Sequence, residues 1–312
     1  MPLGAYIARR ILWTVPLILG VMLVTFALMR GAGGDPFNPP EGFGGLPESE
    51  ARKLRAHYHL SEPWLVEFAY WVENVFTFEF GPSLLVRDLD VADIVRNALP
   101  VTVTLVLLAA AWAVPAGVAL GVWAASNRNR IQDLLATSLA AVLLVVPVFF
   151  VVFVLREYFV LEWRIVSDGW EKTSARVLPV LALGLAPAGY VARLVRTALV
   201  DALEEDYVRT ARAKGLRRQR ILWVHALRNA LAPLLSAAIP MIALLITGAF
   251  FVEQAFRIPG ISSFFVTAAQ ARDYPMVMNL TVALAVVVLV ANLVADVLLA
   301  LVDPRILERQ RR

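Results

Sequence analysis

The sequence predicts an all-α membrane protein with six transmembrane helices, and three observations lead to this prediction. Of the 312 residues, 59% are hydrophobic and 17% are charged, whereas ordinary globular chains have about 45–50% and about 25%. Mean hydropathy is +0.69, which is more than a water-exposed surface can carry. Six uncharged apolar runs approach or exceed the roughly 20 residues that a helix needs to cross a bilayer. With this composition and no cysteine, a disordered chain, a disulfide-rich module and a zinc-thiolate protein are excluded.

The six runs are predicted to be helices, because unpaired backbone groups are too costly in lipid and the alternating pattern of membrane strands is absent. They are Ile11–Met29, Leu99–Ser126, Leu134–Leu155, Val177–Ala192, Leu231–Val252 and Tyr274–Ala295. The fourth run is the shortest, but it continues through Arg193 and Arg196, whose long side chains can snorkel. The sixth continues past Asp296 to Val302. The first lacks the small-residue cleavage pattern of a signal peptide, so we expect it to be retained.

Positive charge is concentrated on one predicted side of the membrane. The two termini and the loops 127–133 and 193–230 together carry 17 of the 29 lysines and arginines. Residues 31–98, between the first two runs, instead hold 5 basic and 11 acidic residues. Both termini are therefore predicted to face the cytoplasm. The net charge of +4 reflects this basic face and gives no indication of nucleic-acid binding.

The roughly 70 residues between the first two runs are predicted to lie on the external side of the membrane. Residues 31–45 are rich in glycine and proline and read as irregular loop. Glu48–His59 is polar and compatible with a helix. Pro63–Phe78 is rich in aromatic residues, which indicates packing at the membrane surface, with substrate contact as the alternative. We divide the chain into residues 1–97 (first helix and external segment), 98–303 (core of five helices) and 304–312 (cytoplasmic tail).

The cytoplasmic segment 199–231 is far longer than a helical turn requires. It is predicted to form two short helices, Asp201–Lys214 and Arg217–Asn229, around Gly215, which suits the left-handed residue after a helix. Glu205 precedes Arg209 by four residues, a stabilising ion-pair spacing. A small-residue patch ringed by basic side chains is suited to docking into a groove of a partner; its residues are Ala211 and Ala213, with Arg209, Arg212 and Lys214. The alternative is a basic surface loop that serves only membrane topology.

Several chemistries find no support in the sequence. A phosphate-binding loop needs Gly-Lys-Ser/Thr, and none of the lysines (Lys53, Lys172 and Lys214) follows a glycine. All three histidines lie outside the predicted spans, which leaves a membrane-embedded hydrolase without a nucleophile–base pair. His57 and His59 have metal-like spacing but no evident third ligand. Asp296 is the carboxylate well inside a span, so an ion-coupled carrier that works alone remains an alternative.

The cytoplasmic motif Tyr207-Val-Arg-Thr-Ala-Arg-Ala-Lys-Gly215, followed by His225-Ala-Leu-Arg228, resembles the EAA loop of type I permease subunits of ABC importers, the MetI-like fold. More narrowly, the chain resembles the B-type permeases of the dipeptide/oligopeptide/nickel group over nearly its whole length. Other landmarks in the expected order are Arg9-Arg10, Gly34-Asp35-Pro36, Phe256-Arg-Ile-Pro-Gly260, Arg272-Asp-Tyr-Pro275 and Asp303-Pro-Arg305. The chain departs from the pattern where Arg209-Thr210-Ala211 replaces Glu-Ala-Ala, and where Glu79-Phe-Gly-Pro-Ser83 replaces Asp-Leu-Gly-Arg-Ser.

The resemblance implies a transport subunit and not an enzyme, in a bacterial cytoplasmic (inner) membrane. Its coupling helix would seat in a cleft of a separate ATPase; the implied residues are Glu205, Tyr207, Arg209, Thr210, Ala211, Arg212, Ala213, Lys214 and Gly215. The implied partners are a homologous second permease, two ATP-binding subunits and an external substrate-binding protein. ATP and Mg²⁺ would be held by the ATPase subunits, and this chain would hold no cofactor. The implied cargo is small peptides, with nickel or another small solute as the alternative.

Overall fold

The computed structural model describes residues 3–31, 47–57, 59, 62–83, 90–228, 234 and 237–302. Apart from turns, loops and an isolated bridge between Pro82 and Asp90, the described residues are helical. This confirms the all-α prediction. The irregular loop predicted over 31–45, the landmarks Gly34-Asp35-Pro36 and Asp303-Pro-Arg305, and the tail 304–312 lie outside the described residues, except for Gly31.

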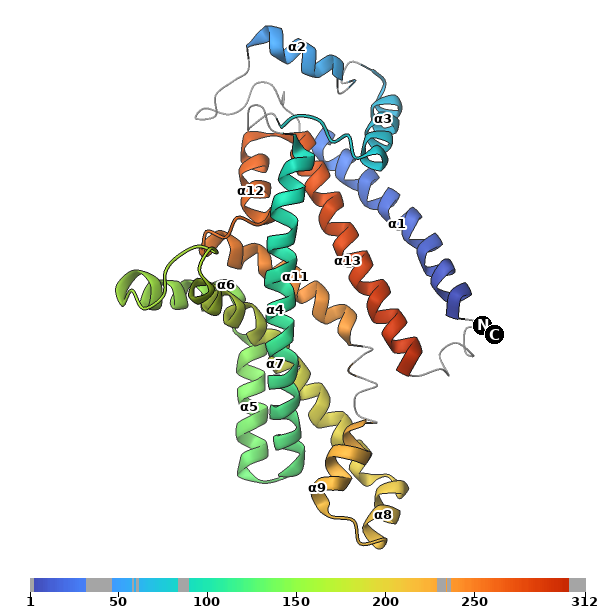
Figure 1. Ribbon diagram of the computed structural model, residues 1–312, viewed down its shortest axis with the longest axis vertical. Coiled ribbons are helices and arrows are strands. Elements are labelled where there is room, and N and C mark those ends of the chain that lie inside the picture. The colour runs from blue at the N-terminus through green and yellow to red at the C-terminus, as the bar shows by residue number, and fades with distance from the viewer. Residues whose placement is uncertain are drawn as a thin grey trace. The chain divides into compact units, whose positions relative to one another are not determined.

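The chain divides into two compact units. The core unit comprises Val103–Ile258 with Met1–Ile7 and Val290–Arg312, and the second unit comprises Ala8–Thr102 with Pro259–Leu289. The core unit contains α5 (Ile131–Val145), α6 (Val148–Leu155), α7 (Thr173–Glu204), α8 (Asp206–Ala213), α9 (Arg218–Arg220), α11 (Ala238–Ala255) and the π-helices η1 (Arg156–Glu162) and η2 (Ile221–Ala226). The second unit contains α2 (Glu48–His57), α3 (Trp64–Thr77) and α12 (Ile261–Ala271), while α1 (Leu3–Gly31), α4 (Val91–Ser126) and α13 (Tyr274–Val302) contribute residues to both (Figure 1).

Four of the predicted spans are single helices. Within the described residues, four helices are long and apolar enough to cross a membrane; they are Gly4–Gly31, Val91–Ser126, Thr173–Glu204 and Tyr274–Leu298. These helices confirm the first, second, fourth and sixth predicted runs. Part of the fifth run lies outside the described residues, and its described part is α11, which begins at Ala238.

The third predicted run, Leu134–Leu155, is wrong as a continuous helix. It consists of α5 and α6–η1, whose axes differ by 92° at the break, and Figure 1 shows α6 turned away from α5. Val146 is extended, with φ −67° and ψ 120°, because the ring of Pro147 disfavours helical geometry in the residue before it. Proline also lacks the N–H that would continue the hydrogen-bond ladder. Counted with this bent pair, the described residues hold up to five spans.

The helices α4 and α7 approach each other closely at glycines. A Cβ added at Gly121 of α4 would lie 2.6 Å from the carbonyl oxygen of Ala192 on α7. Farther along the same pair of helices, the Trp112 indole N–H donates to the carbonyl oxygen of Val180 at 2.8 Å. Only a residue without a side chain fits at Gly121, so this position fixes the separation of the two helices.

We expect Gly121→Leu to destabilise the purified chain by about 1–3 kcal/mol, because an inserted side chain forces the α4 and α7 backbones apart. Thermal unfolding in detergent, followed by tryptophan fluorescence, measures the change. Gly20→Leu on α1 is the matched control, since no heavy atom lies within 4 Å of the Cβ that it adds. Equal loss of stability in both variants would contradict the close-packing interpretation.

In the second unit, half of the aromatic helix α3 faces inward. Phe26 of α1 contacts the rings of Phe68 and Trp71 at centroid distances of 5.4 and 6.3 Å. The Trp71 indole N–H also donates to Asn279 Oδ1 at 3.0 Å. The Glu67 carboxylate pairs with Arg30; burial raises the pKa of Glu67, and the guanidinium opposes that shift. Packing therefore explains part of the aromatic segment, while other aromatic side chains are exposed: Trp64, Tyr70, Phe76 and Phe78.

Two sequence landmarks meet in the second unit. The hydroxyl of Ser83, at the end of Glu79-Phe-Gly-Pro-Ser83, donates to Asp273 Oδ2 at 2.7 Å. The other oxygen, Asp273 Oδ1, accepts the backbone N–H of Met276 at 3.1 Å, which caps the start of α13. Asp273 is fully buried. The landmark around Arg272-Asp-Tyr-Pro275 therefore begins α13 and holds the segment that precedes α4.

We expect Asp273→Ala to destabilise the second unit by about 1–3 kcal/mol, because it removes a helix cap and leaves buried donors without their acceptor. Limited proteolysis of the chain in detergent, over a range of temperatures, should show earlier cleavage. Glu73→Ala removes an exposed carboxylate of α3 and serves as the control. Unchanged protease resistance in Asp273→Ala would refute the capping role.

Candidate coupling loop

The segment after α7 begins with a sharp break at Glu205. Glu205 has φ −68° and ψ 151°, and its carbonyl oxygen accepts the N–H groups of Val208 and Arg209 at 3.0 and 3.3 Å. It therefore occupies the N-cap position of α8. Asp206 follows in the first turn of α8, where a negative charge is favoured by the helix dipole.

The predicted helix Asp201–Lys214 is therefore wrong as one continuous helix, because it is interrupted at Glu205. Residues Asp201–Glu204 are the last turn of α7, and the extended backbone of Glu205 separates them from α8. The predicted ion pair between Glu205 and Arg209 is replaced by one between Arg209 Nη1 and Asp206 Oδ1 at 3.3 Å. Both partners are highly exposed, so this pair stabilises α8 by at most about 1 kcal/mol.

One face of α8 is buried. Val208 is fully buried and Ala211 is 7% exposed; both pack against Ile221, with Leu203 and Leu216 alongside. The predicted outward patch of Ala211 and Ala213 is therefore wrong, because Ala211 faces inward and only Ala213 is exposed. Residues two apart on a helix point in different directions, whereas Val208 and Ala211, three apart, share a face.

The far end of α8 is closed by a turn at Gly215. Gly215 has φ +75°, the left-handed conformation predicted for it, so this prediction is confirmed. The N–H of Leu216 donates to the carbonyl of Ala211 at 3.2 Å, and the N–H of Gly215 donates to that of Arg212 at 3.0 Å. This pair of bonds is the Schellman motif. Leu216 then packs beside Ala211 in the buried cluster, which anchors the turn.

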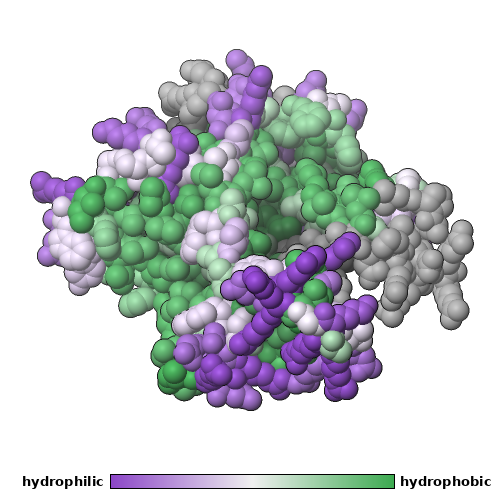
Figure 2. All heavy atoms as spheres, turned by 60° about the horizontal axis from the view of Figure 1, so that its bottom comes forward, coloured by the Kyte–Doolittle hydropathy of each residue, from purple (hydrophilic) through white to green (hydrophobic). Residues whose placement is uncertain are grey.

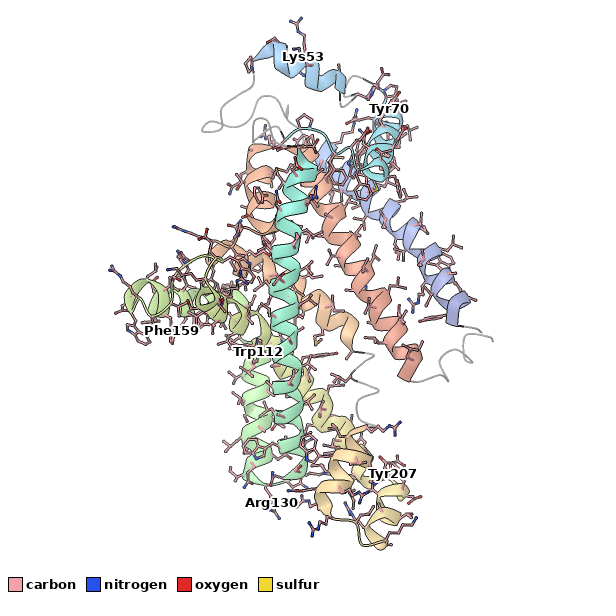
Figure 3. All side chains as sticks on the ribbon, in the orientation of Figure 1. Lys53, Tyr70, Trp112, Arg130, Phe159 and Tyr207 are labelled. Atoms are coloured by element: carbon pink, nitrogen blue, oxygen red, sulfur yellow. The ribbon has the colours of Figure 1, made fainter. Side chains whose placement is uncertain are left out.

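The outward surface of α8 is polar and accessible. Its exposed residues are Asp206, Tyr207, Arg209, Thr210, Arg212 and Ala213, with Lys214 directly after the helix. Figure 2 shows hydrophilic side chains gathered where this end of the core unit comes forward, and Figure 3 shows Tyr207 on α8. The surface combines positive charge with one small residue, Ala213, at which a partner's backbone can approach closely.

The second predicted helix, Arg217–Asn229, has a more irregular form. α9 covers only Arg218–Arg220 and leads into the π-helix η2, and Asn229 lies outside the described residues. Leu222, Ala226 and Leu227 are buried in a cluster with side chains of α4 and α7; the principal contacts are Val122, Ala125, Val191, Val195 and Leu199. The loop is therefore mounted on two of the long helices.

The sequence of the chain matches a known protein family. Residues 117–308 match the family described as "Binding-protein-dependent transport system inner membrane component". The chain belongs to this family. It is a permease subunit of an ABC importer. The described loop, α7 and the last turns of α4 lie within the matched residues.

Relatives of this permease match over almost their full length. The dipeptide transport system permease protein DppB of Bacillus subtilis is 35% identical over 97% of this chain and 98% of its own. The oligopeptide transport system permease protein OppB of Escherichia coli K12 is 35% identical over 96% and 98%. A structure of the MetNI methionine ABC transporter in inward-facing form is 18% identical, with a TM-score of 0.49, over 66% of this chain and 92% of that one.

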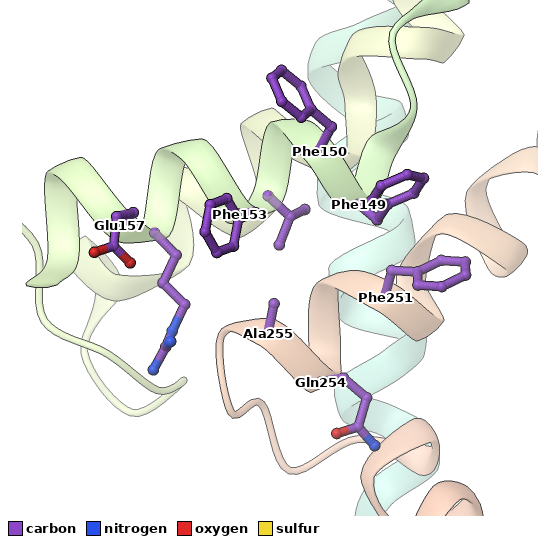
Figure 4. A pocket seen from close by; sticks show the side chains of 9 residues that line it. Phe149, Phe150, Phe153, Glu157, Phe251, Gln254 and Ala255 are labelled. Atoms are coloured by element: carbon purple, nitrogen blue, oxygen red, sulfur yellow. The ribbon is translucent and has the colours of Figure 1, made fainter.

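The permease also contains a cavity that the sequence did not reveal. It has a volume of about 540 Å³ and lies between α6–η1 and α11 (Figure 4). Its lining is Phe149, Phe150, Val152, Phe153, Arg156, Glu157, Phe251, Gln254 and Ala255. Arg156 Nη2 is held by Asp168 Oδ2 at 2.9 Å. Such a lining suits an apolar group more than a charged one. The lining comes from residues 149–157 and 251–255, which are about 100 residues apart, so no local sequence motif indicates the cavity.

The remaining residues singled out from the sequence lie elsewhere. Asp296 is 5% exposed, within α13. The ring of His59 stacks on Tyr70 at a centroid distance of 3.7 Å. No group of three potential metal ligands occurs in the part of the chain that the structure describes.

Proposed function

We propose that this permease moves di- and oligopeptides inward across the cytoplasmic membrane, driven by ATP hydrolysis on separate subunits. The cargo is supported by the names of the relatives, which are dipeptide and oligopeptide permeases about 35% identical over nearly the whole chain. The chain supplies half of the pore and a second, homologous permease supplies the other half. Two ATPase subunits carry ATP and Mg²⁺, and an external binding protein delivers the peptide. Both termini face the cytoplasm.

In this proposal α8 is the coupling helix, and Glu205–Gly215 is the segment that contacts the ATPase. The observation that carries the proposal is that α8 is short, fixed at both ends and exposed on one face. The cap at Glu205 and the turn at Gly215 hold its ends, and Val208 and Ala211 hold its inner face. A helix held in this way transmits a displacement instead of bending. The transport core is the segment 98–303, which carries this loop.

The experiment is purification of the tagged chain from its native membrane in mild detergent, followed by reconstitution of the complex into liposomes. We expect a second permease and Walker-motif ATPases to co-purify, and labelled dipeptide uptake to require ATP and the binding protein. Uptake of Ni²⁺ without peptide uptake would show that the cargo is nickel and not peptides. Flux through liposomes that contain this chain alone, driven by an ion gradient and lost in Asp296→Asn, would overturn the proposal.

A further inference from the structure

An ion pair between a buried aspartate and a partly exposed arginine joins α5 to α7 near the coupling loop. Asp133, in the first turn of α5, is 5% exposed. Arg196 of α7 donates to it twice, from Nε to Oδ1 at 2.9 Å and from Nη2 to Oδ2 at 2.7 Å. The backbone N–H of Asn129 donates to Oδ2 at 3.1 Å. Bidentate contacts of this kind fix the relative orientation of the two groups as well as their distance.

Two further contacts connect the same regions. Arg128, in the α4–α5 loop, pairs with Glu204 at the end of α7, and Arg218 of α9 donates to the carbonyl oxygen of Ser126. Both are exposed, so each contributes little by itself. Together with Asp133–Arg196 they tie the α4–α5 turn to the base of the coupling loop.

The two apolar clusters described around the coupling loop contain no residue of α5. The described side chains of these clusters, which hold α8, α9 and η2, come from α4, α7, α11 and the loop itself. Farther from the loop, α5 does contact α7, where a Cβ at Gly189 would lie 2.6 Å from the carbonyl oxygen of Ala140. At the end of α5 nearest the loop, the ion pair adds a polar link to α7.

A partly buried ion pair need not add net stability, because desolvating the charges offsets part of their attraction. What the bidentate geometry contributes here is a fixed orientation of α5 relative to α7 at this point. We propose that Asp133 and Arg196 are positioning residues of energy coupling: they fasten the cytoplasmic end of α5 to α7, so that a displacement of α8 moves α5 and α7 as one body. The inference rests on the proposed function of α8. The movement is then absorbed at the α5–α6 break around Val146 and Pro147, where the chain already changes direction by 92°.

The first test is made on the complete importer, reconstituted in liposomes, with Asp133→Asn and with Arg196→Gln. The readout is the number of peptides imported per ATP hydrolysed. We expect this ratio to fall about fivefold or more in either variant, while ATPase subunits still co-purify in normal amount. Because both changes break one interaction, the double variant should be no worse than either single variant. Asp201→Asn removes an exposed carboxylate of the same helix, α7, and should retain the ratio.

The second test follows the movement directly. The chain has no cysteine, so spin labels can be attached at Leu134→Cys on α5 and Gln219→Cys on α9, both exposed positions. In the otherwise unaltered complex, the label distance should be the same without nucleotide and with trapped ATP. With Asp133→Asn it should differ between the two states.

The outcomes are distinct for the two proposals. An unchanged ratio of import to hydrolysis in both single variants, or a lower yield of complex with a normal ratio, would overturn the positioning role and leave the proposed function standing. Absence of ATPase subunits from the unaltered complex would overturn the proposed function itself.

Discussion

Replacing Gly215 with proline is expected to abolish peptide uptake while the chain still inserts into the membrane. Proline fixes φ near −65° and lacks a backbone N–H, whereas Gly215 has φ +75° and donates to the carbonyl of Arg212. The substitution is incompatible with the backbone conformation at this position and therefore removes the turn that closes α8. The measurement is labelled dipeptide uptake in cells, with membrane content of the chain determined by immunoblot.

Gly215→Asn is the matched control, since asparagine is the other residue that commonly ends a helix in the left-handed conformation. We expect it to retain most of the uptake. Uptake equal to wild type in Gly215→Pro would contradict the coupling role of α8. If the variant were instead missing from the membrane, the loss of uptake would be due to a folding defect.

A carboxylate at Ala213 is expected to disrupt coupling for a different reason from a carboxylate at Ala211. Ala213→Glu adds bulk and negative charge to the exposed surface of α8, so it should block docking of the ATPase without changing the stability of the isolated chain. Ala211→Glu places a charge among Val208 and Ile221, and an unpaired buried charge destabilises the loop itself. We expect uptake to fall at least about tenfold in both, which corresponds to about 1.4 kcal/mol of coupling.

Two measurements separate these variants. Co-purification of the ATPase should be lost in Ala213→Glu, and protease sensitivity between α7 and η2 should rise only in Ala211→Glu. Arg130→Ala, an exposed change in the α4–α5 loop (Figure 3), is the control for a substitution elsewhere on the polar surface. Normal ATPase recovery and uptake in Ala213→Glu would show that the docking surface lies elsewhere.

Features set by one residue or by long apolar runs could be predicted from the sequence. Four spans follow from hydrophobicity, because hydrocarbon imposes a length on a helix regardless of its neighbours. The left-handed turn at Gly215 follows from the one residue that adopts it without strain. The coupling loop could be recognised because its motif is local.

Features that depend on backbone geometry or distant contacts could not be predicted. A proline within an apolar run permits a bend, but its neighbours decide the angle. Here Pro147 stands in extended conformation between α5 and α6, whose axes differ by 92°. The break at Glu205 gives no strong local signal, so the inward face of Ala211 was missed. Ser83 and Asp273, and likewise Asp133 and Arg196, are separated by 190 and 63 residues, and a single sequence does not pair them.

The central claim, that the exposed face of α8 seats on an ATPase subunit, is tested most directly by cross-linking. Since the chain has no cysteine, Ala213→Cys introduces a single thiol that can carry a short photoactivatable cross-linker in the purified complex. We predict a cross-link from position 213 to an ATPase subunit, and little labelling of Ala211→Cys, because position 211 is buried. An assembled complex in which position 213 is labelled but forms no cross-link to an ATPase would contradict this claim.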